Sequence, residues 1–200
     1  IALAANALGE IDPDFARLNA VLGAPPLWER DPGFPTLVYI ILEQQVSLAS
    51  AAAAYNKLQD AIEISPENFL LLDDAELKRI GFSRQKTGYC RGLARAVIEG
   101  AFDLDALPCM DDHAVRTALM KIKGIGRWTA DIYLLMALLR PDIWPVGDLA
   151  LVAALQKLKK LPTRPQPDEV DQLAEPWKPW RAVAARMLWQ YYLSPQYNQI

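Results

Sequence analysis

The chain has 200 residues, of which 52% are hydrophobic, and a mean hydropathy of +0.03, which is typical of one folded domain or of two closely associated lobes. No apolar run reaches the ~20 residues that a membrane-spanning helix requires, so we expect no membrane association. Two cysteines are too few for a disulfide framework or a four-cysteine cluster, which favours a cytoplasmic or nuclear protein. A chain that opens at Ile1 is expected to lack its native start.

The net charge of −3 is unevenly distributed along the chain. Residues 1–76 contain three basic and twelve acidic residues, a net −9, whereas residues 77–200 contain eighteen basic and twelve acidic residues, a net +6. The second part can therefore form a basic face for a polyanion, although a solvated surface without a partner would have the same charges.

Taken in chain order, the sequence predicts helices throughout. Several begin with an Asp or Ser that is typical of an N-cap, and Pro follows this residue at 13 and 66. Strand-like alternation is missing, and 162–167 is the one stretch that resembles a linker. We therefore predict an all-α fold, with helices over about 13–22, 34–44, 48–62, 66–72, 74–80, 84–99, 112–122, 127–140, 149–160 and 180–193.

The sequence "KIKGIGRW" interrupts the helical pattern at Gly124 and Gly126. Two glycines between two helices predict a tight helical hairpin whose main-chain N–H groups are accessible. The second helix adds the positive end of its dipole, so the hairpin suits a phosphate. The alternative from the residues alone is an ordinary C-cap glycine in a helical bundle.

A single carboxylate, Asp148, follows Gly147 at the start of the next apolar helix. By itself this residue is explained as an N-cap. It also has the character of an anion fixed at a helix N-terminus, which a reaction that develops positive charge can use.

The segment 119–151, "LMKIKGIGRWTADIYLLMALLRPDIWPVGDLAL", resembles the hairpin, Gly/Pro-rich loop and Asp signature of the helix–hairpin–helix DNA glycosylase superfamily. It is most similar to the branch that removes alkylated bases, 3-methyladenine DNA glycosylase II. The stretches "LEQQVSLASA", "GFSRQKTGYCRGLA" and "PWRAVAARMLWQYYL" are also similar to motifs of that branch, so the resemblance extends over about Phe34 to Leu193.

The resemblance implies one glycosylase domain, 1–200, that forms a helical two-lobed bundle with a cleft between the lobes. One lobe is expected at about 34–140 with the hairpin at 119–128, and the other at about 141–200 together with 1–33. It further implies a monomer that binds double-stranded DNA with alkylated bases and needs no cofactor.

The resemblance makes Asp148 the catalytic residue, which stabilises the oxocarbenium-like sugar after the base is flipped out. No second carboxylate is needed, because an alkylated purine is already cationic and leaves without protonation. Its flat cation suits aromatic faces. The expected base pocket consists of Trp128, Trp189, Ile132 and Trp144, where Ile132 replaces a tyrosine found in close relatives. Trp128 also occupies the position of the lysine that forms a Schiff base in bifunctional members, which implies an enzyme without lyase activity.

The remaining expected contacts are with DNA and with a cation. Gln45 matches the position of the wedge that fills the gap left by the flipped base, and Lys86 is a candidate for a phosphate contact. Both could instead be ordinary surface residues. The full set of expected DNA-binding residues is Gly124, Gly126, Ile125, Arg127, Thr129, Lys121, Lys123, Gln45, Gln44, Ser47 and Lys86. The family also implies Na⁺ or K⁺ at the main-chain carbonyls of Met120, Ile122 and Ile125.

Two other functions remain open at this point. A non-catalytic helix–hairpin–helix module would bind DNA without needing a carboxylate such as Asp148. A glycosylase for neutral oxidised or deaminated bases would have the same motifs and a pocket of different shape.

Overall fold

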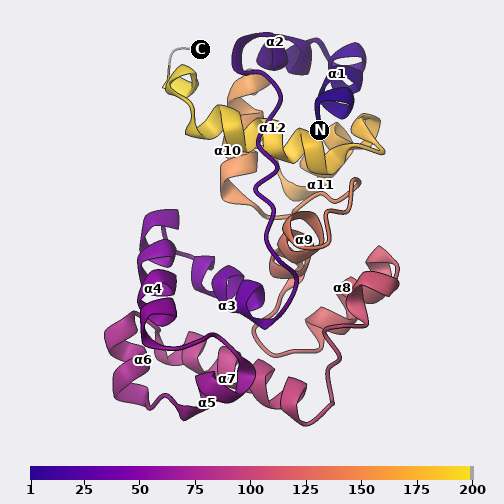
Figure 1. Cartoon of the computed structure of the whole chain (residues 1–200). Coiled ribbons are helices and arrows are strands. Elements are labelled where there is room, and N and C mark those ends of the chain that lie inside the picture. Colours follow the sequence, from indigo (N-terminus) through magenta and orange to yellow (C-terminus); the bar gives the residue numbers. More distant parts are fainter. Residues whose placement is uncertain (199–200) are drawn as a thin grey trace. The chain divides into compact units, whose positions relative to one another are not determined.

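The computed structural model describes residues 1–198, and within that range every regular element is a helix (Figure 1). This confirms the predicted all-α fold. No helix in the described range is long and apolar enough to cross a membrane. The α-helices are α1 (Ala2–Ile11), α2 (Pro13–Leu22), α3 (Phe34–Glu43), α4 (Leu48–Ala61), α5 (Pro66–Leu71), α6 (Asp74–Ile80), α7 (Arg84–Ile98), α8 (Asp112–Met120), α9 (Arg127–Met136), α10 (Leu149–Leu158), α11 (Pro167–Ala174) and α12 (Arg181–Leu193).

Side-chain caps begin most of these helices, as their sequences predict. In each case the side chain accepts a hydrogen bond from a first-turn N–H group that would otherwise lack a partner. At α6, Asp73 accepts from Glu76 N while Glu76 accepts from Asp73 N, which completes a capping box. The other caps of this kind are Asp12, Ser47, Ser65, Ser83, Asp111 and Asp148.

The chain forms two compact units. Residues 30–138 make up one unit, which is continuous in sequence and contains α3 to α9. In it α3 packs against α4, α7 and α9, and α8 packs against α9. The core residues of α3 are apolar over nearly its whole length, which is why this helix is central to the unit.

The other unit combines 1–29 with 139–200 and so contains α1, α2 and α10 to α12. Helix α12 contacts α1, α2 and α10. Its residues 182–189 are all buried, so this part of the helix has no exposed face and lies in the core of the unit. The predicted single glycosylase domain with lobes at 34–140 and 141–200 plus 1–33 stays a prediction.

Three local expectations differ from the structure. Helix α9 ends at Met136 rather than near Arg140, because Leu138 N bonds back to Tyr133 O and Leu139 then adopts a left-handed φ of 53°. Helix α11 was not predicted, and it begins at Pro167, the last residue of the linker-like stretch. Helix α1 was not predicted, since its sequence has no capping side chain.

Candidate active site

The loop between α8 and α9 is shaped by Gly124. Its φ of +95° is one that side chains rarely adopt, and a Cβ added there would overlap the ring of Tyr89. Tyr89, on α7, therefore packs directly against the glycine backbone. The predicted hairpin depends on a contact between residues that lie 35 positions apart in the sequence.

Gly126 has a different role in the same loop. It is the N-cap of α9, its backbone is in an ordinary extended conformation, and a Cβ added there would meet nothing within 4 Å. It brings no side chain to the first-turn amides of α9, which leaves the positive end of the helix dipole accessible. This is the geometry expected for a site that takes an anion from outside.

Basic side chains surround the hairpin. Lys121 and Lys123 are exposed, and the side chain of Arg127 is 56% exposed. Asp131 on α9 is fully buried and binds Arg116 of α8 at 2.7 Å, while Arg127 Nε lies 3.6 Å from its second oxygen. The buried carboxylate thus joins the two helices and orients a cation at the start of α9. Neither Asp131 nor Arg116 was identified from the sequence.

The turn after α3 is tied to the hairpin through Gln44. Its Nε2 donates to Gly124 O at 2.9 Å and to Thr129 Oγ1 at 3.0 Å. Gln45, the next residue, is exposed and has a left-handed φ of 55°. The structure therefore brings Gln44, Gly124 and Thr129 together and leaves the side chain of Gln45 in solvent, where a wedge residue would need to be.

Four other expected DNA contacts have structural roles of their own. The hydroxyl of Ser47 caps α4, and Lys86 Nζ donates to Leu42 O at 2.7 Å. Burial lowers the pKa of Lys86. The side chains of Ile125 and Thr129 are buried, so a DNA contact at either residue has to use the main chain.

Asp148 lies in the other unit, at the N-cap of α10, and is 9% exposed. Its Oδ1 accepts from Leu151 N at 2.9 Å and from Trp189 Nε1 at 3.3 Å. One geometry therefore makes Asp148 both a helix cap and a carboxylate held in a fixed position. A buried carboxylate oriented by two donors has little freedom to reorganise as a neighbouring positive charge forms.

Comparisons with known proteins show the family to which the chain belongs. The family model for the HhH-GPD superfamily of base excision DNA repair proteins matches residues 38–179. The chain belongs to this superfamily. The matched range includes the hairpin, Gln44, Gln45 and Asp148, but ends before Trp189.

Among related sequences, YfjP of Bacillus subtilis is 32% identical over 126 residues, which cover 58% of this chain and 44% of that protein. The chain therefore spans less than half of YfjP. DNA-3-methyladenine glycosylase 1 of Schizosaccharomyces pombe is 27% identical over 152 residues, 72% of this chain and 67% of that protein. The solved structure of the S. pombe 3-methyladenine DNA glycosylase Mag1 with abasic DNA superposes with a TM-score of 0.91 at 27% identity, over 97% of this chain and 98% of that one.

The residues expected in the base pocket differ in how deeply they are buried. Trp128 is half-buried on the first turn of α9, and Ile132, one turn later, is 2% exposed. Trp144 is 5% exposed and packs edge-to-face on Trp177, with ring centroids 5.6 Å apart. Its place in a base pocket stays a prediction.

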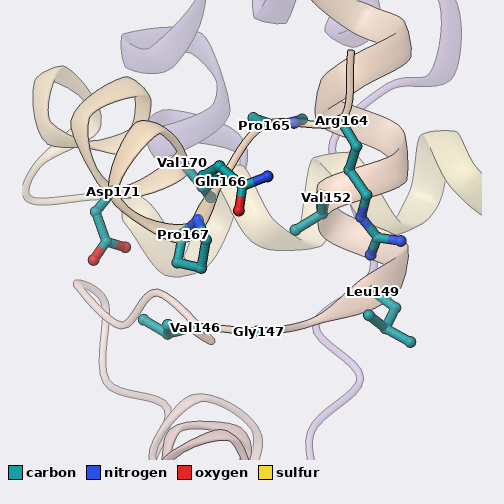
Figure 2. A pocket seen from close by; sticks show the side chains of 10 residues that line it. All are labelled: Val146, Gly147, Leu149, Val152, Arg164, Pro165, Gln166, Pro167, Val170 and Asp171. Atoms are coloured by element: carbon teal, nitrogen blue, oxygen red, sulfur yellow. The ribbon is translucent and has the colours of Figure 1, made fainter.

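A pocket of about 250 Å³ opens next to the Asp148 segment (Figure 2). Gly147 and Leu149, which flank Asp148, form part of its wall, and the long side chain of Arg164 extends toward Leu149. Asp148 itself does not line it, and the walls are largely apolar. The pocket is therefore a hollow separate from the Asp148 carboxylate, and it was not predicted from the sequence.

Proposed function

We propose that this protein is a monofunctional DNA glycosylase that excises alkylated, cationic purines of the 3-methyladenine and 7-methylguanine type from double-stranded DNA. The observation that carries the proposal is the buried Asp148 carboxylate held by Leu151 N and Trp189 Nε1 in a chain of the HhH-GPD superfamily. The names of the yeast relatives support the choice of lesion.

The proposed reaction requires few chemical contributions from the protein. The bond between the sugar C1′ and the base nitrogen breaks, and its electron pair neutralises the cationic base as it leaves. Asp148 stabilises the positive charge on the sugar, and a water molecule then adds to C1′ and loses its proton to the carboxylate or to solvent. No acid is needed for the leaving group.

The hairpin supplies the grip on DNA. The phosphate backbone would bind at the uncapped N-terminus of α9 and at the side chains of Lys121, Lys123 and Arg127. Gln45 would enter the stack of base pairs after the damaged base is flipped out. Trp128 would provide an aromatic face for the cationic base. Because Trp128 replaces an imine-forming lysine, the product is an uncut abasic strand.

A monovalent cation at the hairpin belongs to the same proposal. The main-chain carbonyl of Ile122 accepts a hydrogen bond from Ile125 N, which closes a turn directly after α8. The neutral carbonyl oxygens of Met120, Ile122 and Ile125 would hold a hard cation such as Na⁺ or K⁺, which would supply positive charge for binding a DNA phosphate. The protein is proposed to act as a monomer in the cytoplasm or nucleus.

The decisive experiment incubates the protein with methylated duplex DNA and identifies the released bases by chromatography. Release of 3-methyladenine and 7-methylguanine by the wild-type protein, and its loss in Asp148→Asn, is the expected result. Release of neutral oxidised or deaminated bases alone would overturn the proposed substrate class. Tight DNA binding without any base release would leave the non-catalytic binding module as the function.

A further inference from the structure

Trp28, in the segment between α2 and α3, has an unusual backbone. Its φ is 48°, in the left-handed region, although it is neither Gly nor Asn. Bulky residues rarely adopt this conformation because the side chain approaches the following carbonyl. The side chain is only half-buried, so burial of the ring in a core does not account for the strain. Such outliers persist where surrounding contacts fix them, often near functional sites.

The contacts that fix Trp28 come from α12. Arg186, which is 2% exposed, donates from Nε to Leu27 O at 2.8 Å and so holds the preceding residue. The ring of Trp28 meets that of Trp189 edge-to-face, with centroids 6.5 Å apart and an angle of 67° between the planes. Burial lowers the pKa of Arg186 to about 10, so its guanidinium stays charged at neutral pH and the bond to Leu27 is charge-assisted.

Trp189 is the link from this contact to the carboxylate. Its Nε1 donates to Asp148 Oδ1 at 3.3 Å, which is long for an N–H···O bond. A bond of this length depends on the direction of its donor, and the direction is set by whatever holds the indole ring. Trp28 packs against that ring from the α2–α3 segment.

We propose that Trp28 is a positioning residue for Asp148, which it orients through the indole of Trp189. The inference rests on the proposed function, in which Asp148 is the catalytic carboxylate. The strained backbone of Trp28 is then maintained because it places the ring against Trp189.

The first test does not depend on activity. The indole ¹H–¹⁵N resonance of Trp189 is assigned by NMR and compared between the wild type and Asp148→Asn. The same pair is then compared in a Trp28→Ala background. We expect Asp148→Asn to shift the Trp189 resonance when Trp28 is present. In the Trp28→Ala background, the shift caused by Asp148→Asn should be smaller by about half or more. Equal shifts in both backgrounds would refute the proposal even if the protein excised no base.

The second test uses single-turnover excision of a cationic lesion by Trp28→Ala, Trp28→Phe and Trp28→Gly. Trp28→Ala should lower the rate by about three- to tenfold, the size expected for one aromatic pair, with little change in DNA affinity. Trp28→Phe should recover most of the rate. Trp28→Gly relieves the strained φ but has no ring, so it should unfold at least as high in temperature as Trp28→Ala and remain equally slow.

Trp180 supplies a matched control, because it is a half-buried tryptophan at the N-cap of the same helix α12. Trp180→Phe should leave the rate and the Trp189 resonance unchanged. A rate restored by Trp28→Gly would mean that the backbone rather than the ring matters, and would overturn the proposal. Absence of excision in the wild type would reject the proposed function, while the NMR comparison would still decide the role of Trp28.

Discussion

Helices α9 and α10 both begin close to a glycine, and they differ in what caps them. Gly126 starts α9 without a side-chain cap, whereas Asp148, after Gly147, starts α10 with its carboxylate bonded to Leu151 N. The N-terminus of α9 leaves its amides and the positive end of its dipole accessible to an external anion. The N-terminus of α10 uses the amide of Leu151 to hold the carboxylate of Asp148. The presence or absence of a side-chain cap therefore separates a helix end suited to a phosphate in one unit from a fixed carboxylate in the other.

Removing the charge of the capped end should have the largest effect. Asp148→Asn keeps an oxygen for Leu151 N and Trp189 Nε1 but has no negative charge to offer the sugar. We expect single-turnover excision to fall by a factor of ~10² to 10³, with DNA affinity unchanged or improved. Excision at the wild-type rate would mean that Asp148 is a cap and nothing more.

The converse change gives α9 a cap of its own. Gly126→Asp should satisfy a first-turn amide and place a negative charge where a phosphate would bind. Affinity for damaged and undamaged DNA should fall alike, by about 10- to 100-fold, since the contact is to the backbone. The free energy of unfolding should hold or rise, because a Cβ at this position meets nothing and Asp is a better cap than Gly. The measurements are fluorescence anisotropy and thermal unfolding.

Two variants control that result. Gly126→Ala adds a Cβ without charge and should weaken binding less than Gly126→Asp. Gly124→Ala should destabilise the fold by about 2–4 kcal/mol, because it strains the backbone and overlaps Tyr89. A Gly126→Asp protein that keeps full affinity for undamaged DNA but no longer selects lesions would contradict the assignment of the grip.

The smallest effect is expected for Trp128, in the first turn of α9. Trp128→Ala should slow excision of a cationic lesion by roughly 2- to 30-fold through loss of a cation–π face, and of a neutral lesion by less. Borohydride should trap no covalent complex with the wild type, since Trp128 cannot form an imine. Equal losses on the two lesions would assign Trp128 to packing.

Sequence patterns predicted the features that depend on residues close together in the chain. The capped helix starts depend on residues within one turn of each other, so their order along the chain is sufficient. The two glycines mark the position of the hairpin in the same way, although its packing against Tyr89 is not local. The end of α9 was misplaced because the left-handed turn at Leu139 has no glycine to announce it.

Contacts across the sequence were not predicted. Nothing near Trp28 indicates that it meets Trp189, 161 positions later, or that Gln44 bonds to Gly124. The packing of Trp144 on Trp177 could not be predicted either, because tryptophan suits both base stacking and cores. Asp148 was found because its motif is local, whereas the donors that orient it include Trp189 from another helix.

The discontinuous unit has a consequence for how the chain folds during synthesis. Residues 30–138 are continuous and can fold as soon as they leave the ribosome. Helices α1 and α2 must wait, because Asp12 between them is bound by Lys159 Nζ at 2.6 Å and by Trp177 Nε1 at 3.0 Å, both from the last third of the chain. We therefore expect the nascent protein to form the hairpin between α8 and α9 before the carboxylate of Asp148 is in place.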